Sequence, residues 1–366
     1  MRFIDEYRNP MLADRILSAI TALSKRIAEP VTIMEICGSH TYAIGRFGIR
    51  EMLPPGIRLI SGPGCPVCVT SAEDIDKALF LAGQKNIIFA TFGDMFRVPG
   101  SNGATLQKIR ASGSDIRIIS SAGDCIRLAQ SNGTREVVMM GIGFETTSPT
   151  VAAAVESCRR KGITNFSVFS VHKVIPPAIL ALMEDPDLKI DGFICPGHVS
   201  TIIGSDAYKI IPQSGRAAVI TGFEPVDILE GILMILRQIA DGRKEVSIQY
   251  GRGVNPAGNR KAMDLLETVF FRTQSQWRGL GRIADSGLRF RAAYSSFDAV
   301  EKFCVPEIHS EEVKGCSCGD VLRGKKIPQD CRLFGKLCSP ANPVGPCMVS
   351  SEGTCAAYYN YHRSGE

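Results

Sequence analysis

The feature that most limits the possible folds is an alternation of short apolar runs and longer amphipathic segments between residues 31 and about 240. Gly- or Pro-marked turns separate most of these runs from the segments that follow. Strands that alternate with helices are typical of βαβ units, in which the helices cover a parallel sheet. We therefore predict an α/β fold whose strands form one large parallel sheet or two smaller ones. The predicted strands are Val31–Ile36, Ile57–Ile60, Asn86–Ala90, Ile116–Ile119, Val137–Ile142, Phe166–Ser170, Gly192–Cys195 and Ala217–Thr221.

Helical periodicity is found before, between and after these strands. Residues 1–30 are predicted to form a helical lead-in, because Ile16, Ile20 and Ile27 recur at roughly helical spacing. After Tyr250 the pattern changes, and beyond residue 304 the chain is rich in Cys, Gly and Pro but poor in apolar periodicity. Such a segment buries little core of its own and is expected to need a metal or a cluster. Other predicted helices are Glu73–Ala82, Thr150–Arg160, Pro177–Met183, Val226–Gln238 and Arg260–Phe271.

Charge and hydropathy argue against several classes of partner. The formal charge is only +5 and no Lys/Arg-rich run is present, which argues against nucleic acid. No apolar run approaches the roughly 18–20 residues that span a bilayer. Asp5, Glu6 and Asp14 stand where a signal peptide would need a basic start and an apolar block. We expect a cytoplasmic protein that binds neither nucleic acid nor a membrane.

The cysteines are concentrated at the C-terminal end. The chain has 13, and seven of them fall between Cys304 and Cys355. Thiolates are soft ligands, and a cubane iron–sulfur cluster takes four of them at irregular spacing. Structural zinc usually shows two tight Cys-x-x-Cys pairs, which this region lacks, so a cluster is favoured over zinc or disulfides alone. One self-consistent ligand set, with Cys318 and Cys347 as spare thiols, is Cys316, Cys331, Cys338 and Cys355.

A further cysteine follows the first predicted strand, in Ile36-Cys37-Gly38-Ser39-His40. Open α/β sheets bind ligands at the carboxyl ends of their strands. The N-terminus of a following helix would favour the Cys37 thiolate, and His40 could add charge or a ligand nitrogen. The alternative is a buried structural cysteine beside a capping serine.

A Cys-x-x-Cys, formed by Cys65 and Cys68, follows the second predicted strand. The capping-box pattern Thr70-Ser71-Ala72-Glu73 comes directly after it and is expected to open the next helix. Thiols just ahead of a helix are stabilised as thiolates, and two of them can close a disulfide. The pair could also be half of a zinc site. No second such pair is present in the sequence, so redox or exchange chemistry is favoured.

Polar residues also follow other predicted strands. Glu145 and Thr146 come after Val137–Ile142, and His198 comes after Gly192–Cys195. If the sheets are parallel, these side chains and Cys37 can converge on one cleft, where they could move protons or orient ligands. The sequence contains no Gly-x-Gly-x-x-Gly after a strand and no phosphate-binding Gly-Lys-Ser/Thr. It therefore gives no reason to expect a nucleotide cofactor.

Several of these segments together resemble the motifs of the HypD family of NiFe-hydrogenase maturation proteins. The tail spacing Cys-x14-Cys-x6-Cys-x16-Cys, through Cys316, Cys331, Cys338 and Cys355, is similar to the cluster-binding signature of that family. The resemblance spans essentially the whole chain. The remaining matching segments are Cys37-Gly38-Ser39-His40, Gly62-Pro63-Gly64-Cys65-Pro66-Val67-Cys68, Gly143-Phe144-Glu145-Thr146-Thr147 and Pro196-Gly197-His198-Val199-Ser200.

The resemblance implies two α/β domains around a cleft and a third domain that holds a 4Fe-4S cluster. On this basis we expect the helical lead-in (1–30) to pack on the C-terminal domain. The first α/β domain is expected at 31–130, the second at 131–245 and the cluster domain at 246–366.

The resemblance also implies a function as the scaffold on which the Fe(CN)2CO unit of the hydrogenase is assembled. The iron would be shared between Cys37 and a small HypC-type chaperone, and a HypE-type protein would deliver cyanide as a thiocyanate on its C-terminal cysteine. Cys65 and Cys68 would be redox-active thiols between cleft and cluster. This is a scaffold with redox activity rather than a conventional turnover enzyme. The alternatives are a free-standing, cluster-coupled thiol–disulfide reductase and a metal-stapled binding module.

Overall fold

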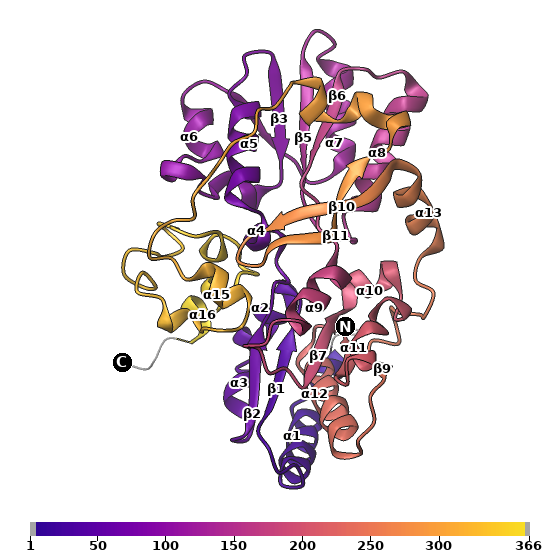
Figure 1. The fold of residues 1–366 in the computed structure, drawn as a ribbon, viewed down its shortest axis with the longest axis vertical. Coiled ribbons are helices and arrows are strands. Elements are labelled where there is room, and N and C mark those ends of the chain that lie inside the picture. The colour runs from indigo at the N-terminus through magenta and orange to yellow at the C-terminus, as the bar shows by residue number, and fades with distance from the viewer. Residues whose placement is uncertain (1–4, 363–366) are drawn as a thin grey trace.

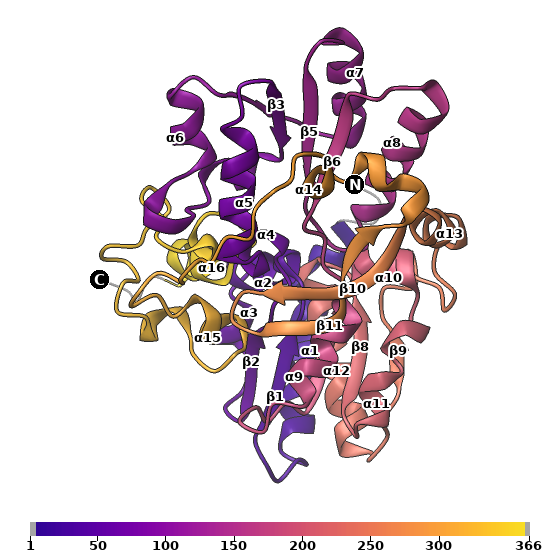
Figure 2. The same cartoon turned by 45° about the horizontal axis from the view of Figure 1, so that its top comes forward.

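The computed structural model describes residues 5–362. Residues 1–4 and 363–366, at the ends of the predicted lead-in and of the C-terminal region, lie outside the described residues. Two parallel sheets are arranged one above the other, with an antiparallel hairpin crossing between them (Figures 1 and 2). The Cys-rich C-terminal segment, yellow in Figure 1, lies against one side of this junction.

The lower sheet has five strands in the order β2-β1-β7-β8-β9, and the upper sheet has four in the order β4-β3-β5-β6. All neighbours within each sheet are parallel, as in the pairings Ile33↔Leu59 and Val138↔Ser167. The α/β prediction is therefore confirmed, and all eight predicted strands are present. The strands are β1 (Val31–Glu35), β2 (Ile57–Ser61), β3 (Ile87–Thr91), β4 (Asp115–Ile118), β5 (Glu136–Gly141), β6 (Phe166–Ser170), β7 (Gly192–Pro196), β8 (Ala217–Thr221) and β9 (Val246–Ile248).

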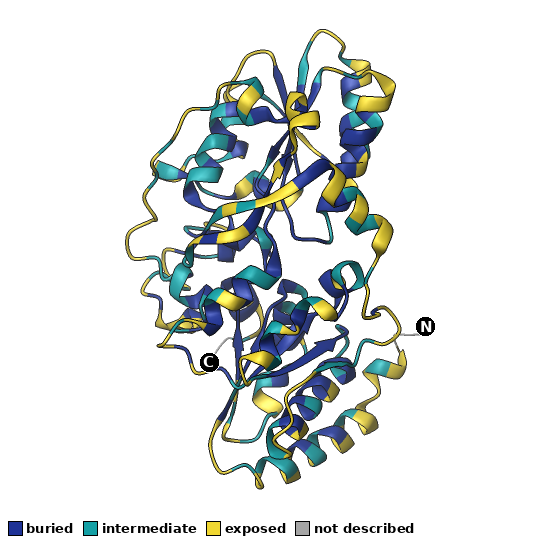
Figure 3. Cartoon of the chain, turned by 45° about the vertical axis from the view of Figure 1, so that its right-hand side comes forward, coloured by how far each residue is buried: buried dark blue, intermediate teal, exposed yellow. Residues whose placement is uncertain are grey.

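Most of these strands read as continuous apolar runs because they are buried on both faces. In β5, Val138 and Met140 belong to a core that extends into the lower sheet, and Val137 and Met139 belong to a second core on the opposite face of the upper sheet. A third core covers the outer face of the lower sheet under α1 and α12. Figure 3 shows the resulting dark blue strands and the yellow outer faces of the helices.

The helices agree with most of the predicted ones. The predicted helix Arg260–Phe271 ends earlier, at Val269, because Phe270 begins a strand. The α-helices are α1 (Pro10–Ser24), α2 (Gly38–Arg46), α3 (Ile49–Met52), α4 (Pro66–Val69), α5 (Ala72–Ala82), α6 (Leu106–Ala111), α7 (Ala122–Ser131), α8 (Ser148–Lys161), α9 (Ile175–Met183), α10 (Gly197–Ile203), α11 (Ile210–Gln213), α12 (Pro225–Ala240), α13 (Arg260–Val269), α14 (Ala299–Lys302), α15 (Cys318–Leu322) and α16 (Thr354–Tyr361). The 3-10 helices are η1 (Asp5–Arg8), η2 (Gly93–Arg97), η3 (Ser101–Gly103), η4 (Asp206–Tyr208), η5 (Ala292–Phe297), η6 (Pro328–Asp330) and η7 (Pro346–Met348).

The hairpin between the sheets was not predicted. It pairs β10 (Phe270–Trp277) with β11 (Gly281–Phe290) in antiparallel register. Many of its residues are polar and exposed, so it lacks the apolar run by which the other strands were recognised. Trp277 at its end is fully buried and forms a β-bridge with Thr70.

The expected sequential domains do not coincide with the sheets. The boundary at residues 130 and 131 falls between β4 and β5, which share the upper sheet, whereas β1 and β2 pair with β7 in the lower sheet. The reason is that the chain crosses between the sheets twice, after β2 through α4 and α5 and after β6 through α9. The lead-in helix α1 packs against α12 of the lower sheet, and not on the C-terminal region as expected, because its apolar face joins the core beneath that sheet.

Candidate functional site

The loops that follow strands of both sheets meet at one cavity of about 390 Å³. They follow β1, β2 and β7 of the lower sheet and β5 of the upper sheet, and one further segment comes from the C-terminal region. The predicted residues Cys37, Thr146 and His198 therefore lie around one space. The lining residues are Cys37, Ser39, Gly64, Pro66, Gly143, Phe144, Thr146, Thr147, His198, Val199, Thr201, Ile202 and Glu352.

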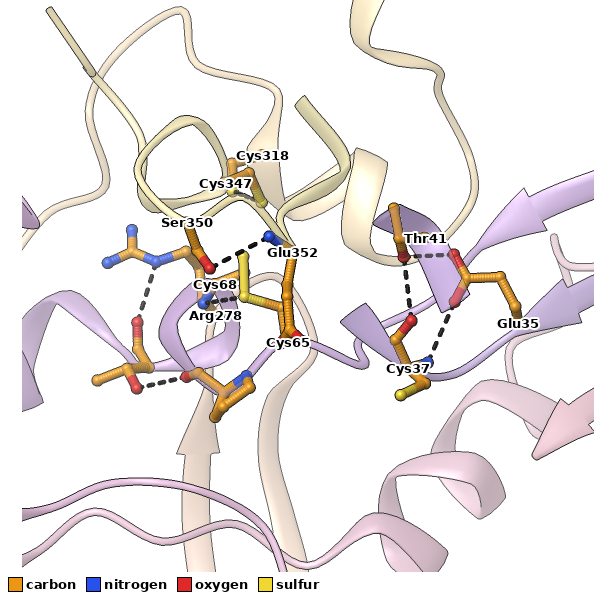
Figure 4. Close-up of a disulfide and its surroundings, with 12 residues drawn as sticks. Glu35, Cys37, Thr41, Cys65, Cys68, Arg278, Cys318, Cys347, Ser350 and Glu352 are labelled. Carbon is orange, nitrogen blue, oxygen red and sulfur yellow. Dashed lines mark hydrogen bonds between the residues drawn. A yellow bond between two sulfur atoms is a disulfide. The ribbon is translucent and has the colours of Figure 1, made fainter. Parts of the chain in front are cut away.

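Cys37 is the N-cap residue of α2 and is only 8% exposed. A carboxylate oxygen of Glu35 accepts a hydrogen bond from the Cys37 backbone N–H at 3.1 Å. The other oxygen accepts one from the Thr41 hydroxyl at 2.5 Å. Glu35 thus holds both the cap and the first turn of α2, which fixes the direction of the Cys37 side chain (Figure 4).

The Cys37 thiol is protonated in this environment. Its pKa is raised to about 12, chiefly by burial and in part by the Glu352 and Glu35 carboxylates, although the N–H groups of His40 and Ser39 oppose the shift. The N–H groups at the start of α2 favour the thiolate, as expected, but desolvation outweighs them and keeps the pKa of the thiol high. A metal that binds Cys37 must release this proton.

Cys65 and Cys68 form a disulfide with a Cα–Cα distance of 5.3 Å. They precede α5, as predicted, and in addition belong to the short α4, of which Cys65 is the N-cap. The next helix, α5, is capped by Ser71 rather than Thr70, through a 3.1 Å bond from the Asp74 N–H. Gly38 N–H donates to Gly64 O at 2.9 Å, which ties the loop of Cys37 to the loop that carries the disulfide.

The C-terminal cysteines come together in space and fit the thiolate set of an iron–sulfur cluster. Burial raises the pKa of Cys338, and its neighbours Cys355 and Cys331 raise it further. A Cβ added at Gly345 would lie 2.9 Å from Cys316 Sγ, so a glycine is needed for this loop to approach the sulfur. Within residues 5–362, no group of His, Cys, Asp or Glu side chains is arranged to hold a single metal ion. A cubane does not require that arrangement, because each of its four thiolates binds a different iron.

The two predicted spare thiols are in direct contact, with 2.7 Å between Cys318 Sγ and Cys347 Sγ. Hydrogen bonding with Cys316 and Cys347 lowers the pKa of Cys318, and bonding to Cys318 raises the pKa of both partners. Figure 4 shows this pair near the Cys65–Cys68 disulfide, with Cys37 on the other side of that disulfide. The structure therefore brings the thiols of the cleft and of the C-terminal region into one neighbourhood.

His40 lies behind the cavity rather than in its lining. Its Nε2 is 2.9 Å from both Gly222 O and the Thr221 hydroxyl, and burial lowers its pKa to about 4, so the ring is neutral. Its Nδ1 is buried without a hydrogen-bond partner. Phe223 stacks between the His40 and His198 rings, with centroid distances of 4.8 and 3.9 Å. His40 thus supports His198 through an aromatic ring.

Glu145 also lies outside the cavity lining. It is buried, and one carboxylate oxygen accepts from the Ile175 N–H at the start of α9 at 3.1 Å. The other oxygen has no hydrogen-bond partner, and burial raises the pKa of Glu145 to about 7. Glu145 is therefore placed to hold the start of α9 near the end of β5, while its neighbour Thr146 faces the cavity.

Sequence reasoning missed several residues of the site. Glu352 accepts from the Ser39 hydroxyl at 2.6 Å and lines the cavity, although it is far from Cys37 in the chain. Phe223 comes shortly after β8, so the same search for residues that follow strands could have found it. Arg278, on the unpredicted hairpin, is buried and donates to Thr70 O at 3.0 Å beside the disulfide, and it is paired with Glu312. No sequence signal marked Glu352 or Arg278.

None of the helices among the described residues is long and apolar enough to cross a membrane.

Comparison with known proteins gives one consistent result. A family model described as "HypD: Hydrogenase formation hypA family" matches residues 11–362. The chain is 47% identical over 371 residues to the hydrogenase maturation factor HypD of Rhodobacter capsulatus, covering 99% of this chain and 98% of the relative. It is 47% identical to HypD of Azotobacter vinelandii over 370 residues, 99% of this chain and 97% of that one. It is 43% identical to HypD of Escherichia coli strain K12 over 369 residues, 99% of both chains.

Proposed function

The chain belongs to the HypD family, and we propose that it serves hydrogenase maturation as the scaffold on which the Fe(CN)2CO unit is assembled. The observation that carries this proposal is the placement of Cys37 in a cavity between the two sheets, next to the Cys65–Cys68 disulfide. The comparisons do not support the alternative of a free-standing thiol–disulfide reductase.

In this proposal iron is the substrate, and Cys37 is its anchor. A soft thiolate suits low-spin Fe(II), which cyanide and CO favour, and a single protein ligand leaves the other coordination positions open. The volume of the cavity, about 390 Å³, leaves room for small ligands around the Cys37 sulfur. A HypC-type chaperone would share the iron at the open side, and a HypE-type protein would deliver cyanide to it.

The cysteine pairs would supply the reducing power for cyanide transfer. Cleaving a cyanide-bearing sulfur adduct requires two electrons, which a dithiol at Cys65 and Cys68 provides together with two protons as it closes to a disulfide. Cys318 and Cys347, 2.7 Å apart, form a second pair of the same kind. Cys316, Cys331, Cys338 and Cys355 would hold a 4Fe-4S cluster, which when bound supplies electrons one at a time.

The polar residues of the predicted site would act at different distances from the iron. Thr146 and His198 line the cavity and are placed to orient a ligand or exchange a proton. His40 would position His198 through Phe223, and Glu145 would act as a positioning residue through α9. We also propose a cytoplasmic location, because eleven of the 13 cysteines are free and thiols persist in reducing compartments.

The assembly function predicts infrared bands from cyanide and carbonyl ligands on the protein. We expect them after anaerobic purification from cells that also make the partner proteins, and we expect them to disappear when the cyanide donor is omitted. A preparation with full iron content but without bands in the cyanide and carbonyl region would contradict the scaffold proposal.

The cluster assignment predicts about four iron atoms and four acid-labile sulfides per chain. We expect the Cys338→Ala variant to lose most of both, because one of the four thiolates is removed. Cys304→Ala is the matched control, since Cys304 is exposed and lies outside the predicted ligand set. Zinc without sulfide in the wild-type protein would refute the cluster and leave only the thiol pairs as reductants.

A further inference from the structure

A second hollow, which we call the tail groove, lies beside the C-terminal cysteines and has a volume of about 630 Å³. One wall comes from the segment between η2 and the end of α6, and the other comes from Val313 and the loop 341–344. Figure 1 shows α6 above the yellow C-terminal loops on the same side of the molecule. This groove is distinct from the Cys37 cavity, with which it shares no lining residue.

The tail groove reaches two of the predicted cluster ligands. Val344, in its wall, donates its N–H to Cys338 Sγ at 3.4 Å. Val313, in the opposite wall, accepts a hydrogen bond at its carbonyl from the Cys316 N–H at 3.1 Å. Val344 therefore links the groove directly to the Cys338 sulfur, and Val313 links it to the backbone of Cys316.

The charge of the tail groove is positive and is not neutralised by side chains. Lys108 donates to Gly103 O at 2.7 Å, and Arg97 donates to Pro340 O and Val349 O at 3.2 and 3.3 Å. Backbone carbonyls are thus their hydrogen-bond acceptors, and no acidic residue among residues 5–362 lines the groove. Glu312, next to Val313 in sequence, is paired with Arg278.

Apolar surface borders these charges. Val313 is 39% exposed, and Leu337, whose carbonyl accepts from the Asn342 side chain at 3.1 Å, is 66% exposed. An exposed leucine and valine beside uncompensated cations are typical of a protein contact rather than of a site for a small reductant.

We propose that the tail groove is the docking site of a small acidic one-electron carrier protein, which reduces the cluster. This inference rests on the cluster of the proposed function. One electron leaves the reduced centre of the carrier and enters the cluster, and no bond is formed or broken. Opposite charges would steer the encounter, and redox encounters of this kind use small, transient interfaces.

The test measures binding before it measures electron transfer. The probe is an oxidised, acidic plant-type 2Fe-2S ferredoxin, titrated against the anaerobically purified protein at low and at high salt. We expect binding that weakens with salt, and a Kd raised about tenfold or more in the double variant R97E/K108E, because like charges then face each other. The single variant K108E, whose side chain is exposed and bonds to Gly103 O, should show a smaller shift of the same sign.

The matched control is the charge reversal K25E/R26E at the end of α1, where both side chains are exposed on the lower sheet. It makes the same change in net charge and should leave the Kd within about twofold. If ferredoxin binding weakens equally in this control, binding depends on the net charge of the protein and not on the groove, and the proposal is overturned. An unchanged Kd in both groove variants would overturn it as well.

Stopped-flow reduction of the cluster gives the second readout. With photoreduced ferredoxin, R97E/K108E should slow the reduction about tenfold or more at low salt and K108E should slow it less, whereas reduction by dithionite should not change in either variant. If dithionite is slowed equally, the variant has damaged the cluster rather than a docking site, and the proposal fails. If the wild-type protein binds ferredoxin but lacks the cyanide and carbonyl infrared bands, the assembly function is refuted and the docking site is not.

Discussion

The Cys37→Ala variant is expected to lose the cyanide and carbonyl infrared bands completely while it keeps the iron and sulfide of the C-terminal cluster. The physical reason is that Cys37 provides the only cysteine sulfur in the lining of the cavity. Loss of its thiol removes the soft anchor for Fe(II), and the half-buried hydroxyls of the cavity lining are poor substitutes. The measurement combines infrared spectroscopy with iron and sulfide analysis of the same sample.

Two further variants separate the role of Cys37 from its packing. Cys37→Ser keeps the volume of the side chain and should also lack the bands. Cys125→Ala removes an equally buried thiol from α7, in the core on the outer face of the upper sheet, and should keep them. Normal bands in Cys37→Ala would mean that the iron is anchored elsewhere.

Gly64→Ala is expected to have the largest effect of any single methyl group added near the site. A Cβ at this position would lie 2.1 Å from the Cys37 backbone nitrogen and 2.4 Å from its Cα. Backbone atoms cannot turn aside as a flexible side chain can, and Gly64 O also accepts from the Gly38 N–H at 2.9 Å. We expect a loss of about 3 kcal/mol or more in the free energy of unfolding, at the upper end of overpacking costs.

Chemical denaturation of the anaerobic protein measures this loss. Gly133→Ala is the control, because no heavy atom lies within 4 Å of its added Cβ, and it should change stability by less than about 0.5 kcal/mol. A folded Gly64→Ala variant of wild-type stability that still carries the infrared bands would show that the two cysteine loops are not packed as closely as described.

The sheets were predictable because their strands are buried on both faces. Two-sided burial leaves continuous apolar runs such as Val137–Met140, which few other structures produce. The hairpin was missed because its strands are half-exposed and depend on one buried anchor, Trp277, rather than on a pattern. Sheet membership was missed because hydropathy records burial and not which strand lies next to which.

The candidate site, like the fold, was predicted correctly only in part. Strand-end reasoning found Cys37, Thr146 and His198, since parallel strands bring their carboxyl ends to one edge. The same reasoning placed His40 and Glu145 in the cleft, but one supports His198 through Phe223 and the other caps α9. A residue's position after a strand does not determine whether its side chain points into the cavity or into the core.

The sequence by itself determined the fold class, the cysteines available for chemistry and the family to which the chain belongs. These follow from local periodicity and from motifs that are contiguous in the chain. Only the tertiary structure decided that Glu352 reaches Ser39, that Cys318 meets Cys347 and that Val344 and Val313, which line an outer groove, are bonded to Cys338 and Cys316. These contacts join segments far apart in the chain, and they form because the two sheets, the hairpin and the C-terminal loops bury one another's apolar surfaces.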